Sequence, residues 1–317
     1  MISKTRPLFP KTNQNSQNKN KKIVILILFL FLIFGYWFYL LENKSHLNDS
    51  LNIDQLMTTK GIHDLSAINT QEFYSYLKDL SDNPEPFSYH VSGVVIPHHL
   101  LAGSMIAYLL KRVSSQAPKT IVLIGPNHFE KGTKPVLTSH YSWQTPFGIL
   151  KPNTELISKL QNNDFIGVEE SILVNEHAIT GTVSFINYFM PNTTFVPLII
   201  SHRISYGEIE QMAEDLYSLV DINTLLILSV DFSHYLNSEQ AQKRDAISLK
   251  EIQDFDLEKI ALFSNEYVDS PKALILFLKI MQLKGTQNVE VIDHTNSGIL
   301  TNNPYSENTS YFTLVFH

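Results

Sequence analysis

Three apolar runs of the sequence are each followed, within a few residues, by a histidine. The runs are residues 91–96, 120–124 and 225–230, and the histidines are His98, His128 and His234. In open α/β sheets, ligands bind in the crevice beyond the carboxyl ends of the strands. If these runs are neighbouring strands, the three imidazoles lie at one edge of the sheet, where they could bind a metal ion or transfer protons. The sequence therefore predicts a functional site at that edge.

Two acidic residues and a further histidine extend this set. Asp231 stands three residues before His234, where its carboxylate could orient an imidazole ring or accept hydrogen bonds from the backbone amides of its own turn. Glu176 and His177 open a segment, 177–188, that has helical spacing of apolar residues. An acid at the start of a helix complements the helix dipole, which alone explains Glu176, whereas His177 could reach the crevice. Both alternatives stay open for each of these residues.

The elements that must position these residues alternate along the chain. Besides the three runs above, strand-length apolar segments occur at 195–200, 289–292 and 311–316. Helical spacing of apolar residues occurs at 70–80, 101–113, 154–160, 177–188, 206–220, 238–253 and 271–283. Runs that are continuously apolar indicate strands buried on both faces. The alternation predicts an α/β fold, specifically a three-layer α/β/α domain with a largely parallel central sheet.

The beginning of the chain has a different character. Residues 23–41 form an apolar run interrupted only by Gly35, which reaches about 28 Å as a helix and so matches the hydrocarbon thickness of a bilayer. This run predicts one N-terminal transmembrane signal-anchor helix. We therefore expect a basic cytoplasmic tail (1–22), the membrane helix (23–41), a polar stalk (42–65) and the α/β domain (66–317).

Charge and cysteine content limit the location and the chemistry. Residues 1–22 carry six of the 24 basic side chains and none of the 31 acidic ones, which leaves the rest of the chain with a formal net charge of −13. By the positive-inside rule, the N-terminus is cytoplasmic and the main domain of this single-pass membrane protein is extracytoplasmic. An acidic domain is a poor partner for nucleic acid. The sequence has no cysteine, which excludes disulfides and thiolate ligands.

Six short motifs occur in one order along the sequence. They are VVIPHH, IVLIGPNH, TPFGIL, NEHA, FVPLII and SVDFSH. With these motifs the sequence resembles the Memo family, which includes protein B of the bacterial AmmeMemoRadiSam system, and the resemblance covers residues 66–317. It implies a fold like that of the catalytic subunit of class III extradiol dioxygenases and a bound iron or copper ion. It also implies a functional link to other AmmeMemoRadiSam components.

By motif position, the resemblance implies roles for single residues. His98 and His128 match the family's two metal-binding histidines, and His234 matches the position of an acid–base residue. The family's third metal ligand is often a cysteine, and Asp269 stands at that position here. Asp269 has an alternative role as the cap of a helix that begins near Pro271, or as the residue before that cap.

Two other positions depart from the family pattern. The usual Ala-Gly-Tyr after the first metal-binding histidine is replaced by His99, Leu100 and Leu101, and a second acid is replaced by Thr180. These losses favour a non-catalytic module that binds a peptide or a partner protein. Retention of all three strand-end histidines favours catalysis.

Two imidazoles and one carboxylate form a ligand set that suits Fe(II) and leaves positions open for substrate and dioxygen. Histidine with carboxylate also suits Zn(II), whose bound water would be acidified for hydrolysis. The sequence therefore predicts a membrane-anchored metalloprotein that holds a divalent metal, with iron, copper and zinc as alternatives. Its His-lined crevice would carry dioxygenase-like redox chemistry on a small molecule or peptide, and the second candidate activity is metal-dependent hydrolysis.

Overall fold

A computed structural model describes residues 61–64, 69–78, 80, 84–286 and 288–317. The chain divides into two units, residues 1–59 and 60–317, and all the described residues belong to the second. The predicted tail (1–22) and membrane helix (23–41) lie outside the described residues, as does most of the predicted stalk. Among the helices that are described, none has the length and apolar character needed to cross a membrane.

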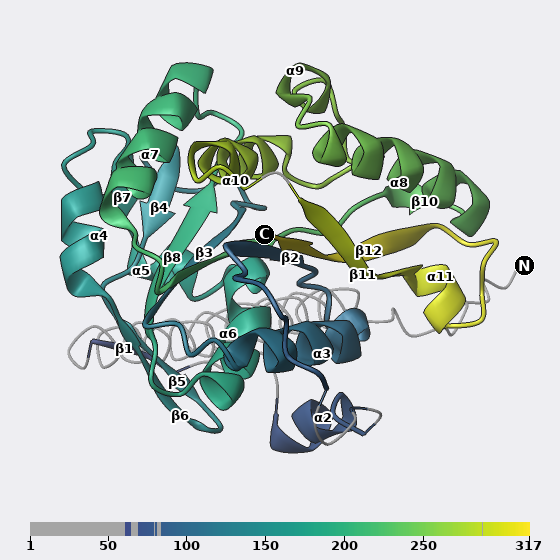
Figure 1. Cartoon of the computed structure of the whole chain (residues 1–317), viewed down its shortest axis with the longest axis horizontal. Coiled ribbons are helices and arrows are strands. Elements are labelled where there is room, and N and C mark those ends of the chain that lie inside the picture. Colours follow the sequence, from purple (N-terminus) through teal and green to yellow (C-terminus); the bar gives the residue numbers. More distant parts are fainter. Residues whose placement is uncertain (1–60, 65–68, 79, 81–83, 287) are drawn as a thin grey trace, which may run out of the picture. The chain divides into compact units, whose positions relative to one another are not determined.

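The described residues form a mixed α/β fold around a 12-stranded sheet (Figure 1). Its centre is parallel, because β6, β8, β3, β9 and β2 pair side by side in the same direction. These strands are β6 (Gly148–Pro152), β8 (Thr194–Ile200), β3 (Thr120–Pro126), β9 (Thr224–Ser229) and β2 (Gly93–Ile96). The predicted α/β fold with a largely parallel central sheet is confirmed.

Antiparallel strands extend the sheet on both sides. Beyond β2 lies β12, which pairs antiparallel with β2, with β10 and with β11. Beyond β6 lie β5 and β1, while β4 and β7 branch from β8. The bounds are β12 (Asn308–Phe316), β10 (His234–Leu236), β11 (Val289–Asn296), β5 (Ser142–Thr145), β1 (Ile62–His63), β4 (Val136–Thr138) and β7 (Ile166–Val168). The strand β1 falls within the segment 42–65 and pairs with β5.

Helices cover both faces of the central sheet, and the side chains of each strand alternate between them. In β3, Val122 packs into one apolar core with α7 (Tyr206–Leu219) and α10 (Pro271–Leu283). Its neighbours Ile121 and Leu123 pack into the other core with α3 (Gly103–Ser114) and α6 (His177–Phe189). Figure 1 shows α7 and α10 on one side of the sheet and α3 and α6 on the other, which gives three layers.

Side-chain caps set where several helices begin. The helices α4 (Thr154–Leu160), α8 (Ser238–Gln253) and α10 each follow an Asn or Ser whose side chain accepts a backbone N–H of the first turn. The remaining helices are short: α2 (Thr70–Ser75), the 3₁₀ turn η1 (Leu100–Ala102), α5 (Glu170–Leu173), α9 (Leu257–Ile260) and α11 (Ser297–Leu300). The helix predicted at 70–80 ends at Ser75 in the structure, five residues earlier than expected.

Candidate metal centre

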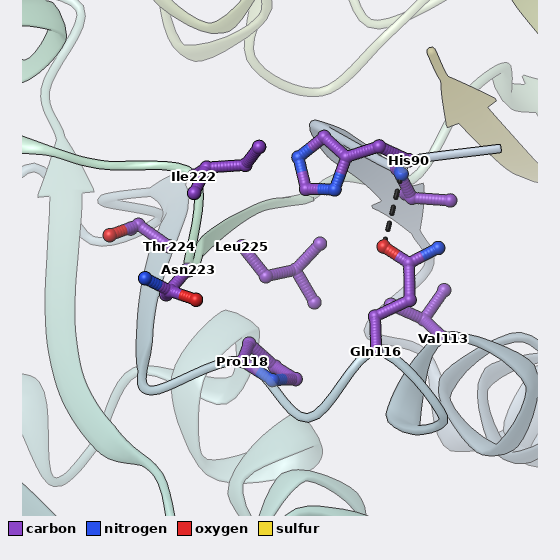
Figure 2. Close-up of a pocket in the computed structure, with 9 residues that line it drawn as sticks. His90, Val113, Gln116, Pro118, Ile222, Asn223, Thr224 and Leu225 are labelled. Carbon is purple, nitrogen blue, oxygen red and sulfur yellow. Dashed lines mark hydrogen bonds between the residues drawn. The ribbon is translucent and has the colours of Figure 1, made fainter.

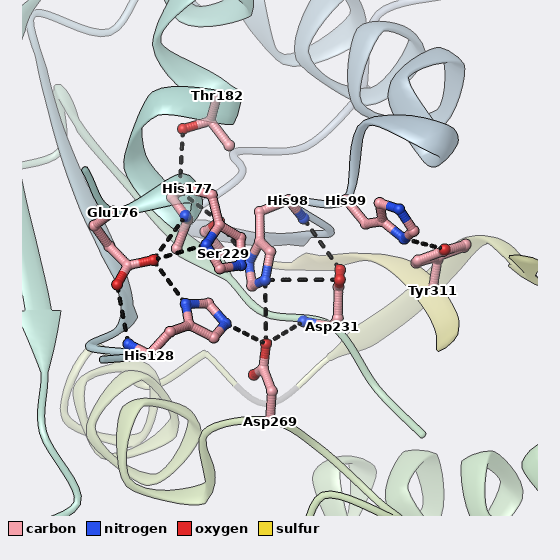
Figure 3. A network of polar contacts seen from close by, with 11 residues as sticks. His98, His99, His128, Glu176, His177, Thr182, Ser229, Asp231, Asp269 and Tyr311 are labelled. Carbon is pink, nitrogen blue, oxygen red and sulfur yellow. Dashed lines mark hydrogen bonds and ion pairs between the residues drawn. The ribbon is translucent and has the colours of Figure 1, made fainter. Parts of the chain in front are cut away.

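Three neighbouring parallel strands deliver their following residues to one edge of the sheet. His98 follows β2, His128 follows β3 and Asp231 follows β9, which lies between those two strands. His177 opens α6, and Asp269 stands just before α10. In Figure 3 the side chains of these five residues face one another.

His98 is buried and its hydrogen bonds indicate its tautomer. Ser229 Oγ donates to the carbonyl of Ala178 (2.9 Å) and lies 3.4 Å from His98 Nδ1. Because the hydroxyl hydrogen is already engaged, Ser229 accepts from Nδ1–H, and the lone pair of His98 Nε2 is left free. Burial lowers the pKa of His98 to about 3, so that the ring is neutral at ordinary pH.

The carboxylate of Glu176 holds both the ring and the backbone of His128. Its Nδ1 lies 2.6 Å from Glu176 Oε1, and its backbone N–H donates to Glu176 Oε2 (2.9 Å). Burial opposes protonation of His128, but hydrogen bonds to Asp269 and Glu176 outweigh it and raise the pKa of the ring to about 9. With Nδ1–H bonded to Glu176, the ring directs Nε2 toward Asp269 Oδ2, 3.7 Å away.

Glu176 and His177 both take part in this site. Glu176 is the N-cap of α6, where its side chain accepts the N–H of Ala178 (3.2 Å). Burial opposes its ionisation, yet the contact with His128 keeps the pKa of Glu176 below its usual value. The ring of His177 stacks on that of His128, with centroids 3.8 Å apart and planes inclined by 25°. Glu176 is therefore both a helix cap and a partner of the His128 ring, and His177 lies against His128 at the same edge of the sheet.

His98, His128 and His177 form a group that could hold a metal ion. One ring nitrogen from each lies within 4.8 Å of the others. The side chains of His98, His128 and His177 are 2%, 23% and 51% exposed, so the group runs from the interior to the surface. The outermost of the three rings, that of His177, is therefore in contact with solvent.

Asp269 lies against the two imidazoles predicted as ligands. Its Oδ2 accepts the backbone N–H of Asp231 (3.0 Å) and lies 3.3 Å from His98 Nε2. Its Oδ1 is buried and has no hydrogen-bond partner among the described residues. The helix cap is Ser270, whose Oγ accepts the N–H of Ala273 (3.3 Å), and Asp269 is the residue before the cap.

These contacts fit a bound cation. The lone pair of His98 Nε2 and the carboxylate of Asp269 face each other without a hydrogen between them, and a positive charge relieves this repulsion. The protonated His128 supplies that charge in the metal-free protein, and a metal ion would supply it in its place. The buried Oδ1 of Asp269, which has no hydrogen-bond partner among the described residues, also fits a cation at this place. The donors are nitrogen and oxygen atoms, which suit Fe(II) or Zn(II).

Asp231 supports the site through the backbone. Its Oδ1 accepts the N–H of His98 (3.1 Å), whereas its Oδ2 lies 3.6 Å from His98 Nε2. The Asp231 carboxylate thus holds the loop after β2. One of the two predictions from the sequence was that it would bind the amides of its own turn. Burial raises the pKa of Asp231.

His234 stands at the start of β10, outside the group of three histidines. Its N–H donates to the carbonyl of Asn265 (2.9 Å), and its Nδ1 is buried with no partner in the part of the chain that the structure describes. His234 stands three residues after Asp231, and its charge interacts with the Asp231 carboxylate. Its imidazole is therefore free of the contacts that fix His98 and His128.

The contacts of two supporting residues have no signal in the sequence. Ser229 fixes the tautomer of His98, and Tyr311 Oη lies 2.6 Å from Nδ1 of His99, the residue after His98. Both partners come from strands remote in sequence, so no local pattern marks them.

A separate cavity of about 210 Å³ lies at the opposite, amino-terminal ends of β2 and β9 (Figure 2). It is lined by His90, Gln116, Pro118 and Asn223, among others, and by no residue predicted for the site. The carboxyl edge of the sheet thus carries the candidate metal centre.

The chain is similar to proteins of one family from archaea. The family described as Memo-like protein matches residues 64–315. A MEMO1 family protein of Thermoplasma volcanium is 28% identical over 257 residues, which cover 78% of this chain and 93% of that protein. One from Methanococcus vannielii is 29% identical over 238 residues, which cover 70% and 83%.

Among solved structures, an uncharacterized protein of Escherichia coli K12 matches with a TM-score of 0.48 and 12% identity. That match covers 70% of this chain and 99% of the other. The resemblance noted in the sequence is confirmed by the family match, which spans almost the whole of the described unit. The chain belongs to the Memo family.

Proposed function

We propose that this Memo family protein is a membrane-anchored metalloprotein whose carboxyl sheet edge performs non-haem, dioxygenase-like redox chemistry with a divalent metal, iron in the first place. His98, His128 and Asp269 would hold the ion. The observation that carries the proposal is the buried carboxylate of Asp269, which has one oxygen without a partner and the other 3.3 Å from an unprotonated ring nitrogen. Such an ion would supply Lewis acidity and electron transfer to a substrate and dioxygen.

The residues of the chain itself would do the remaining work. Glu176 and Ser229 keep the two Nδ1 atoms occupied, so that both Nε2 atoms face the crevice. Asp231 fixes the loop of His98 through its backbone N–H. His234, whose ring has a nitrogen without a partner, would accept or donate a proton at Nδ1.

Metal content of the full chain, extracted in detergent after metal-replete expression, tests this proposal. His98→Ala, His128→Ala and Asp269→Ala should each lower occupancy by about ten- to a hundredfold or more, since even supporting residues contribute that much. His202→Ala is the matched control, because His202 follows the neighbouring strand β8 and its side chain is 75% exposed. Wild-type protein without metal, or unchanged occupancy in the three variants, would refute the proposal.

A hydrolytic function is the second candidate. It is supported by the three imidazoles, whose nitrogens lie within 4.8 Å, because three histidines with an open position suit Zn(II) and an acidified water. His177→Ala separates the two candidates. It should abolish zinc binding if the three histidines are the ligands, and it should leave iron occupancy largely intact if Asp269 completes the set.

Location and partners belong to the same proposal. The apolar run 23–41 would anchor the protein with its N-terminus in the cytoplasm and the described unit on the outer side. The ligand would be a small molecule or a peptide that enters past the exposed ring of His177. A functional link to other AmmeMemoRadiSam components would follow from the family.

A further inference from the structure

A buried acid that has no part in the metal centre lies behind the turn of His234. Asp245, on α8, is fully buried, and three donors surround its carboxylate. Ser233 Oγ and Ser310 Oγ donate to Oδ1 at 2.5 and 2.6 Å, and His294 Nε2 lies 2.8 Å from Oδ2. Burial of a carboxylate is costly unless its oxygens are hydrogen-bonded, so these donors explain how Asp245 is tolerated there.

The donors join the turn to the neighbouring strand. Ser233 directly precedes His234, and Ser310 lies in β12. Phe232 N–H donates to the carbonyl of Ser310, and Ser310 N–H donates to the carbonyl of Ser233, both at 2.9 Å. Asp245 therefore binds both sides of this backbone pair through their hydroxyl groups, and it links them to α8.

His294 closes the network toward solvent. Its ring stacks on Phe312, with centroids 4.0 Å apart and planes inclined by 12°, and its side chain is 30% exposed. The imidazole donates to Asp245 from β11, a different strand from that of Ser310. Three elements beside the turn, namely α8, β11 and β12, thus meet at one carboxylate.

The ring of His234 needs such support. Its Nδ1 makes no hydrogen bond to any described residue, so the imidazole is not oriented by a partner of its own, unlike His98 and His128. The place of the ring therefore depends on the backbone of the turn that carries it.

We propose that Asp245 is the positioning residue of His234: together with Ser233, Ser310 and His294, it fixes the turn that carries the imidazole. The inference rests on the proposed function, in which His234 transfers a proton. It extends that site to a second layer formed by α8 and β11.

The test uses the full chain in detergent and follows the ring Cε1–H signal of His234 by NMR, assigned through its loss in His234→Ala. In Asp245→Ala this signal should shift or split, and the amide of His234 should exchange with solvent roughly tenfold faster or more, as expected on losing hydrogen bonds to a charged group. Asp245→Asn should restore the wild-type signal, because an amide oxygen still accepts from both hydroxyls. Metal content should stay unchanged in both variants.

Glu251→Ala is the matched control. Glu251 is a buried acid on the same helix, but it binds Lys259 (3.0 Å) and does not contact the turn, so the His234 signal should not move. If Asp245→Ala does not fold, Ser310→Ala must produce the same shift. An unchanged His234 signal in a folded variant overturns the inference. If the wild type holds no metal but the signal responds as expected, the proposed function fails and the positioning role is supported.

Discussion

At the scale of single residues, Glu176 connects a helix end to the candidate metal centre. Its two oxygens accept from the backbone and ring of His128 and from the N–H of Ala178. Glu176→Gln keeps the shape but loses the charge that orients the imidazole, so the dissociation constant for metal should rise about ten- to a hundredfold. Competition with a chelator of known affinity measures it.

Glu170→Gln is the control for that change. Glu170 is a similar acid at the start of α5, bound to Ser139 and to the N–H of His140, and it has no contact with the three histidines. Its replacement should leave metal affinity within experimental error. Equal affinities of Glu176→Gln and wild type would show that Glu176 is a helix cap and nothing more.

The protonation of His128 predicts a dependence of metal binding on pH. Because the pKa of His128 is raised to about 9 when no metal is bound, a proton must leave before Nε2 can bind an ion. Affinity should therefore rise by about tenfold for each pH unit below pH 9 and level off above it. Titrations with metal at several pH values measure this slope, and a flat profile would contradict the raised pKa of His128.

The same group affects the stability of the metal-free protein. The pKa of His128 is raised from 6.5 when unfolded to about 9 when folded, so its contribution is fully present below about pH 6.5 and is lost as the pH rises through 9. Thermal unfolding after chelation should thus show a falling melting temperature over that interval. In His128→Ala this part of the dependence should disappear.

At the scale of elements, the close approach of α6 to the loop of His98 can be tested with a pair of glycines. A Cβ at Gly181 would lie 3.0 Å from the carbonyl oxygen of His98, whereas a Cβ at Gly207, in α7, meets nothing within 4 Å. Gly181→Ala should destabilise the fold by about 1–3 kcal/mol and displace His98. Gly207→Ala should stabilise it by up to about 1 kcal/mol, through helix propensity alone.

Denaturant unfolding and metal content measure both glycine variants. Lower stability and lower occupancy are expected together in Gly181→Ala, because the loop that would have to move carries a proposed ligand. Equal stabilities of the two variants would mean that the loop yields easily and that α6 does not constrain it.

The elements could largely be predicted where local chemistry decides them. The helices α4, α8 and α10 occupy the predicted residues because Asn153, Asn237 and Ser270 cap them and apolar spacing defines their buried faces. The short strands β4 to β7 were not predicted, since β5, for example, reads SWQT and gains its stability from pairing with β1 and β6. Such pairing is a property of the assembled sheet.

The residues of the candidate site divide in the same way, into those that a local sequence pattern marks and those that only the folded structure brings together. His98 and His128 could be found because each directly follows a buried apolar strand, which defines the direction of the chain at that point. The partner of Asp245, His294, is 49 positions away in the sequence, and Ser229 is 131 positions from His98. No short-range pattern links such pairs, so their contacts appear only in the folded structure.

At the scale of the whole molecule, the charge bias before residues 23–41 predicts the orientation in the membrane. An alkaline phosphatase fused after His317 should be active, because this reporter folds only on the outer side of the bacterial membrane and the main domain is expected there. Deletion of residues 23–41 should abolish that activity and move the protein to the soluble fraction. Activity of a cytoplasmic reporter at the same position would reverse the orientation.

The order of the strands also bears on how the protein would acquire the proposed ion. Asp231 and His98 are 133 positions apart, and β2 pairs with β12 near the far end of the described residues, so the centre does not exist in any short fragment of the chain. Folding dominated by such distant contacts is slow, and an unfolded chain offers no preformed site. Metal would then be loaded only after folding. The choice of metal would depend more on the ions present in the compartment where the chain folds than on intrinsic affinity.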